Sequence, residues 1–184
     1  MEYEVIRSRR KTLSMRIKDG RIEIRAPLRT TDAEIRQFLE KHRRWLEKHI
    51  MRARELEQAK AGVRKLTKAE IEDLKKQARK VIPERAAYYA PLIGVTYGKI
   101  AIRCQKTRWG SCSSKGNLNF NCLLMLTPAG VIDSIVVHEL CHRKHMNHSA
   151  RFYAEMAKVL PEYRQHQQWL KENGEMLLAM AGEA

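Results

Sequence analysis

Two histidines and a glutamate interrupt an otherwise apolar stretch at residues 138–142, whose sequence is His-Glu-Leu-Cys-His. Thr127 supplies an N-cap and Pro128 stands at the first helical position, which predicts a helix through this stretch. Apolar residues surround that helix: Val131, Ile132, Ile135, Val136, Val137 and Leu140. Burial of two imidazoles and a carboxylate costs several kcal/mol unless a metal or another partner compensates. The chain must therefore fold in a way that gives these three groups a partner.

The spacing of the two histidines favours a metal ion as that partner. His138 and His142 are four positions apart, so in a helix they lie about 40° apart around the axis and about 6 Å apart along it. Both imidazoles can then reach one ion, which is the chemistry of a His-Glu-x-x-His motif. Glu139 is not needed as a ligand and is placed to take a proton from metal-bound water and pass it to the leaving group. A chance match, or histidines that only satisfy core hydrogen bonds, would leave the cost of burial unexplained.

A third protein ligand is required, and three residues are within range. His145 would lie about 10 Å from His138 along a continued helix, too far for a common ion. Glu155 falls two turns into the next predicted helix and is more typical of a solvated carboxylate. His148 can return to the site if the chain turns at Met146-Asn147, since Asn tolerates left-handed geometry at a helix end. We therefore choose His148.

Three neutral imidazoles would leave the metal its double positive charge and one open position for water. That arrangement is typical of a catalytic site and predicts a hydrolase. Zinc is the expected ion, although imidazole ligands also suit cobalt, nickel, iron or copper.

Periodicity predicts an α+β fold with a distinct N-terminal part. Residues 12–26 alternate around Asp19-Gly20 as in a β-hairpin, with the pairs Leu13 and Ala26, Met15 and Ile24, and Ile17 and Ile22 opposed on one face. A capping box at Thr31 opens a long helix with apolar positions that include Trp45 and ends near Ala59, and a second helix runs from Thr67 towards Tyr88. We expect Pro83 to kink or interrupt this second helix.

The remaining elements belong to a larger C-terminal part. Residues 100–104 and 118–122 alternate as two strands, and helices are expected from about Ser149 and, after Pro161, through Trp169. Residues 60–66 are the best linker, so we divide the chain into a basic leader, 1–62, and a core, 63–184.

Charge and composition bear on location and partners. The chain has 36 Lys and Arg against 21 Asp and Glu, for a net charge of +15. Residues 1–65 contain 19 basic and 10 acidic residues, so nucleic acid is a possible partner, with solvated helix faces as the alternative explanation. No signal-peptide or membrane-spanning pattern and no Cys-x-x-Cys pair are present, so we expect a cytoplasmic protein with reduced cysteines and no membrane partner.

The sequence resembles the YgjP-like metallopeptidase domain family, which is related to the SprT-like and WLM zincins. The resemblance covers nearly the whole chain and rests on residues 108–113 (Arg-Trp-Gly-Ser-Cys-Ser), Gly116, Asn121, residues 132–142, residues 147–149 and Phe152. It implies a zincin-like core, a small twisted sheet with the metal-binding helix packed beneath it, preceded by the hairpin and long helix. It also implies that His138, His142 and His148 bind zinc and that Glu139 is the general base.

The resemblance places residues 109–112, Trp-Gly-Ser-Cys, near the active site. Glycine permits close backbone approach and tryptophan offers a flat apolar wall, so Trp109, Gly110 and Ser111 are candidate substrate-binding residues. An edge strand here could pair with an extended peptide. The alternative is core packing, with Gly110 marking a bulge.

We therefore expect a zinc-dependent hydrolase that acts on peptide bonds of unfolded or extended polypeptides. Two other functions remain open: a metal-dependent phosphohydrolase acting on nucleotides, and a nucleic-acid-binding module with a weak metal site. The absence of a Gly-x-x-x-x-Gly-Lys-[Ser/Thr] segment favours peptides over nucleotides.

Overall fold

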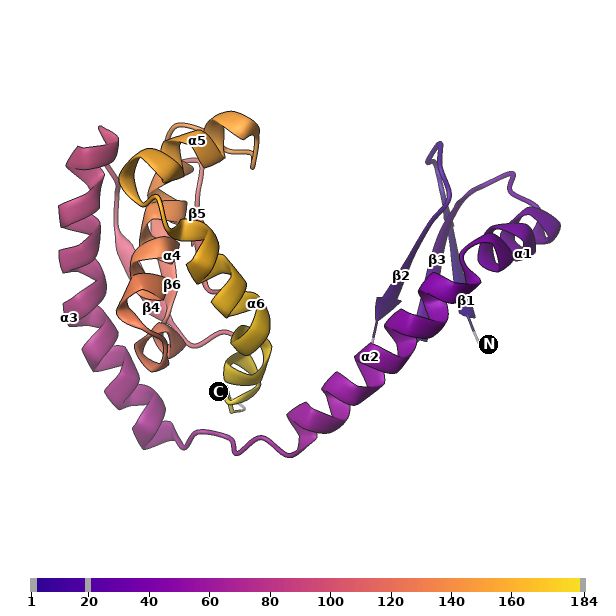
Figure 1. Ribbon diagram of the computed structural model, residues 1–184, viewed down its shortest axis with the longest axis horizontal. Helices are drawn as coiled ribbons and strands as arrows, with labels where there is room; N and C mark the ends of the chain where they lie inside the picture. Colours follow the sequence, from indigo (N-terminus) through magenta and orange to yellow (C-terminus); the bar gives the residue numbers. More distant parts are fainter. Residues whose placement is uncertain (1–2, 19–20, 183–184) are drawn as a thin grey trace. The chain divides into compact units, whose positions relative to one another are not determined.

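The computed structural model describes residues 3–18 and 21–182 (Figure 1). The chain divides into two compact units, Met1–Gly62 and Val63–Ala184, and each is described by itself.

A three-stranded sheet forms the basis of the N-terminal unit. Its strands are β1 (Tyr3–Ser8), β2 (Ser14–Lys18) and β3 (Arg21–Pro27), in the order β1-β3-β2. The antiparallel register of β2 and β3 is the predicted one, with Met15 opposite Ile24 and Ile17 opposite Ile22. The predicted turn at Asp19-Gly20 lies outside the described residues. Strand β1, which the sequence analysis did not identify, pairs parallel to β3.

The single long helix predicted after the hairpin is wrong, because two helices form. These are α1 (Asp32–Lys41), which starts with the predicted capping box, and α2 (Arg43–Ala61), and the break is at His42. On one straight helix Ile35 and Leu46 would lie about 16 Å apart along the axis. With the break, both reach one small core that they share with Ile22, Ile24 and Ala26. Trp45, expected to be apolar packing, is 41% exposed.

The C-terminal unit opens with helix α3 (Lys68–Ile93), capped by Thr67 and Glu70 as predicted. The expected interruption at Pro83 does not occur, since one helix runs through it. Ile82 and Ala86, on either side of the proline, are completely buried, so tertiary packing offsets the lost backbone hydrogen bond.

A second sheet has the order β4-β6-β5, with β4 (Ile100–Arg103), β5 (Gly110–Cys112) and β6 (Leu118–Asn121). The two predicted strands are β4 and β6, which pair in parallel, and β5 adds an antiparallel edge. The remaining elements are η1 (Cys122–Leu126), α4 (Ala129–Cys141), α5 (Ala150–Val159) and α6 (Tyr163–Ala179). Helices and small sheets are mixed in the chain, which confirms the α+β class.

Helix α4 lies at the centre of this unit and contacts α3, α5, α6 and β5. Its N-cap is Pro128, one residue after the position predicted. Val136, Val137 and Leu140 are fully buried together with Leu118 and Phe120 of the sheet. The expectation that the motif-bearing helix packs against a small sheet is therefore confirmed.

A two-pronged ion pair joins α4 to α3. Nε and Nη2 of Arg85 donate to the two carboxylate oxygens of Asp133 at 2.5 and 2.7 Å. Nη2 also donates to the hydroxyl of Tyr89 at 3.2 Å. Paired, charge-assisted hydrogen bonds of this kind fix relative orientation as well as distance. The pair thus helps to orient the helix that carries His138 and His142.

None of the helices within residues 3–18 and 21–182 combines the length and the hydropathy needed to cross a bilayer.

Candidate metal centre

Three imidazoles converge where α4 ends and the chain turns towards α5. Helix α4 ends at Cys141 with His142 as its C-cap, and α5 begins after Ser149. Nε2 of His142 lies 3.2 Å from Nε2 of His138, and Nε2 of His148 lies 3.0 Å from the same atom. The chain therefore does turn between residues 142 and 149, as the choice of His148 requires.

These separations fit a metal ion. Nitrogen ligands about 2.0–2.1 Å from a tetrahedral centre lie about 3.3 Å from one another, close to the observed 3.2 and 3.0 Å. Nδ1 of His142 lies 3.0 Å from the carbonyl oxygen of His145, so this nitrogen carries the proton and donates. Nε2 of His142 is then the atom with a free lone pair, as a metal ligand must be.

Burial keeps the rings of His138 and His142 in the form that binds metals. It lowers the pKa of His138 to about 3, and repulsion from His142 and His148 acts in the same direction. The pKa of His142 is also lowered, mainly by burial. Both imidazoles are consequently neutral near pH 7, and a neutral imidazole is the ligand species.

Phe152 supports the three rings, a role that the sequence analysis did not assign. Its ring centroid lies 4.9, 4.8 and 4.9 Å from those of His138, His142 and His148. The side chain is completely buried. An aromatic residue four positions after His148 was the available signal, but helical spacing alone identifies it only as a core residue.

Glu139 follows the first histidine and is 5% exposed. Burial raises the pKa of its carboxyl to about 8, against the opposing charge of Arg108. Its Oε2 atom is buried and has no hydrogen-bond partner among the described residues. A buried carboxylate oxygen without a protein partner is costly, and water or substrate at the site would supply the partner.

Strand β5 lies directly against this carboxylate. A Cβ atom at Gly110 would lie 2.6 Å from Oε1 of Glu139, so glycine is the residue that permits this approach. Asn121 anchors the segment before β5, because its Nδ2 donates to the carbonyl oxygens of Gln105 and Arg108 at 2.7 and 2.9 Å. The sequence analysis named Asn121 without a role, and a buried asparagine at a strand end was the signal for one.

The structure separates the three candidate substrate-binding residues. Gly110 contacts Glu139. Trp109 instead packs on α6, since a Cβ atom added at Gly174 of that helix would lie 3.3 Å from the indole nitrogen of Trp109. The hydroxyl of Ser111 lies 3.5 Å from Nδ2 of Asn119, its partner across the ladder. Since side chains alternate along a strand, Ser111 faces away from the side on which Gly110 meets α4.

The two other ligand candidates do not join the cluster. His145 contributes its carbonyl oxygen to His142. Glu155 accepts hydrogen bonds from Lys144 at 2.7 Å and Lys158 at 3.2 Å. The ligand atoms of His138, His142 and His148 all lie within 4.8 Å of one another.

Comparisons with known proteins agree with a metal centre. The family model of the YgjP-like metallopeptidase domain matches residues 11–71 and 57–173. None of the curated proteins matches the chain.

Two solved structures are similar to part of the chain. The metallopeptidase zymogen abylysin of Pyrococcus abyssi is 21% identical, with a TM-score of 0.46 over 50% of this chain and 94% of that one. The zymogen jannalysin of Methanocaldococcus jannaschii is 20% identical, with a TM-score of 0.46 over 51% of this chain and 97% of that one.

Removal of any one imidazole of the cluster should abolish stable metal binding. We expect about one zinc per chain in the purified protein, measured by inductively coupled plasma mass spectrometry. His138→Ala, His142→Ala and His148→Ala should each lose it, whereas His145→Ala and Glu155→Ala should retain it. Full metal content in His148→Ala, with loss in Glu155→Ala, would show that the third ligand is wrongly chosen.

The buried carboxyl predicts a specific dependence of stability on pH in the metal-free protein. The pKa of Glu139 is about 8 in the folded chain against an ordinary value of 4.5, so between these values the folded state binds more protons. Its stability relative to the unfolded state then falls as the pH rises. The Glu139→Gln variant carries no charge at this position at either pH. Its free energy of unfolding minus that of the unsubstituted chain should therefore rise between about pH 5 and about pH 8, measured by urea unfolding.

The histidines titrate in both proteins, so their contribution cancels in the difference between the two unfolding free energies. An equal difference at both pH values would contradict a raised pKa at Glu139.

Proposed function

The chain belongs to the YgjP-like metallopeptidase family, and we propose that it is a zinc-dependent peptidase acting on unfolded or extended polypeptides. One observation carries the proposal: Nε2 of His142 and Nε2 of His148 lie 3.2 and 3.0 Å from Nε2 of His138, and the next residue of the same helix, Glu139, has a buried carboxyl oxygen without a hydrogen-bond partner among the described residues. Three imidazole ligands with a nearby carboxyl base are one of the arrangements that support metal-assisted hydrolysis.

In this mechanism His138, His142 and His148 would hold a zinc ion. When bound, zinc lowers the pKa of water and polarises a carbonyl group. Glu139 accepts the proton of the attacking water and delivers it to the leaving amine. Burial raises the pKa of this carboxyl to about 8 in the metal-free protein, and the charge of a bound cation would lower that pKa, which favours the carboxylate that accepts the proton.

Strand β5 supports a polypeptide substrate. It pairs with β6 along one side and ends the sheet on the other, so its outer backbone groups are available to an added strand. An extended peptide bound there would run alongside Gly110, the residue whose backbone touches Glu139. Peptide recognition and the general base are thereby brought to the same place.

Glu139→Gln separates metal binding from chemistry. The amide retains the shape of the carboxyl but cannot accept the proton, so hydrolysis should fall by at least about 100-fold while zinc content stays unchanged. Peptide cleavage and metal content are measured on the same preparation. Retained activity against a genuine substrate would remove Glu139 from the role of base.

The substrate class is tested by supplying polypeptide and nucleotide substrates in separate reactions. Zinc-loaded protein is incubated separately with denatured protein, with DNA-bound protein and with nucleoside triphosphates, with Glu139→Gln as the blank for contaminants. We expect new peptide termini, detected by mass spectrometry, and no phosphate release, since a single-metal site lacks the second ion common in phosphatases. Phosphate or pyrophosphate release that depends on Glu139, without new termini, would instead identify a nucleotide phosphohydrolase.

A further inference from the structure

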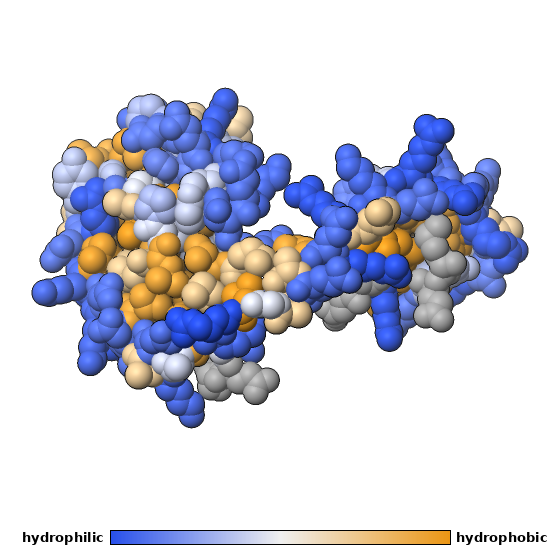
Figure 2. Space-filling view, turned by 60° about the horizontal axis from the view of Figure 1, so that its bottom comes forward, coloured by the Kyte–Doolittle hydropathy of each residue, from blue (hydrophilic) through white to orange (hydrophobic). Residues whose placement is uncertain are grey.

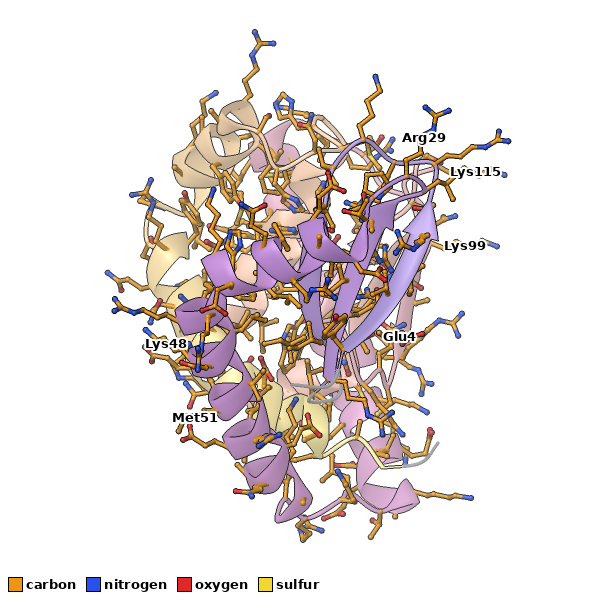
Figure 3. The ribbon with its side chains drawn as sticks, turned by 90° about the vertical axis from the view of Figure 1, so that its right-hand side faces the viewer. Glu4, Arg29, Lys48, Met51, Lys99 and Lys115 are labelled. Carbon is orange, nitrogen blue, oxygen red and sulfur yellow. The ribbon has the colours of Figure 1, made fainter. Side chains whose placement is uncertain are left out.

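Helix α2 presents a row of unpaired cations on the side away from the core of its unit. Leu46 is buried and Ile50 partly buried against that core. Seen down the helix axis, an arc of about 140° that starts at Arg44 contains five residues between positions 44 and 52, and the exposed Met51 lies about 20° outside it, beyond Arg44. We call these five residues the α2 face: Arg44, Trp45, Lys48, His49 and Arg52. Figure 3 shows Lys48 and the nearby Met51 projecting from α2 away from the sheet.

The acidic residues of α2 form no ion pair with the α2 face, although Glu55 follows Arg52 by about one turn on the same side of the helix. Arg44, Lys48 and Arg52 are exposed, and no ion pair joins any of them to another described residue. Glu47, the acidic residue between positions 44 and 52, instead bonds to Arg43 at 3.0 Å, outside this face. Hydrophilic residues also form most of the visible surface of this unit in Figure 2.

An indole stands within these cations in a fixed orientation. Trp45 is 41% exposed, and the ring of His49 stacks on it with centroids 4.0 Å apart and planes 24° apart. Nδ1 of His49 in turn donates to the carbonyl oxygen of Trp45 at 2.7 Å, which holds the imidazole in place. The exposed part of the indole is therefore ordered before any partner arrives, which reduces the entropy cost of stacking.

We propose that the α2 face binds single-stranded nucleic acid. Arg44, Lys48 and Arg52 would contact phosphates along about 12 Å of helix, and an unpaired base would stack on Trp45. Stacking on a protein ring requires a base that is free of its duplex, which favours single strands over double helices. This inference is independent of the chemistry at the three histidines, because it concerns the other unit of the chain.

The same surface fits a membrane less well. A helix that lies on a bilayer inserts its apolar side, but Leu46 and Ile50 of α2 already pack in the core of the unit. Trp45 and Met51 are the large apolar side chains that α2 exposes. Lipid vesicles serve in the test as the alternative ligand, whose binding is compared with that of single-stranded nucleic acid.

The test measures fluorescence anisotropy of labelled oligothymidine and oligouridine of about 20 nucleotides with the full chain, over a series of salt concentrations. The triple variant Arg44→Ala, Lys48→Ala, Arg52→Ala should bind at least tenfold more weakly. Loss of three phosphate contacts should also reduce the slope of log affinity against log salt by about 2. A control triple variant, Lys68→Ala, Lys99→Ala, Lys115→Ala, removes the same charge from exposed lysines of the other unit and should leave the slope unchanged.

Substitution of the indole tests stacking separately from charge. Trp45→Ala should weaken binding about tenfold without changing the salt slope, and Trp45→Phe should recover most of the loss. Circular dichroism establishes that each variant is folded. The proposal is overturned if neither oligonucleotide binds at low salt, or if the two triple variants weaken equally. It is likewise overturned if duplex DNA or vesicles of phosphatidylglycerol and phosphatidylcholine bind more tightly than single strands.

Discussion

The close approach of Gly110 to the carboxylate of Glu139 determines how strand β5 and helix α4 pack together at the candidate site. A side chain on β5 at this position would meet Oε1 of Glu139 at 2.6 Å, so the strand and α4 can pack together only because that side chain is absent. Asn121 fixes the segment that leads into β5, and the Arg85–Asp133 pair holds α4 against α3. Glu139, the helix that carries His138 and His142, and the sheet edge thus share one set of packing constraints.

The sequence predicts the part of the site whose geometry is set by residues close together in the chain. It does not predict the part that depends on contacts between distant segments. His138 and His142 share one helix, so the helical repeat alone brings them together. His148 required the further assumption that the chain turns after α4. Strand β5 has three residues and includes a glycine, so its own pattern is weak, and its pairing with β6 is a tertiary contact that periodicity cannot reveal.

The errors in the N-terminal unit have a similar origin. Apolar residues continue at helical spacing through His42, so the break between α1 and α2 has no local signal; it follows from the need of Ile35 and Leu46 to reach the same small core. Trp45 fits the apolar periodicity yet is exposed, because a sheet of three strands offers too little surface to cover it. Tertiary packing outweighed local pattern in both places.

The three imidazoles differ in how firmly the backbone holds them. His138 lies within the hydrogen-bonded part of α4 and His142 caps that helix, so helix hydrogen bonds hold the backbone of both residues. His148 is exposed and stands before α5, in a connection without regular structure. We therefore expect exchange of a bound ion to begin at this imidazole while the other two stay in position. The short connection between α4 and α5 would then set the lifetime of a bound ion, and all three rings its equilibrium affinity.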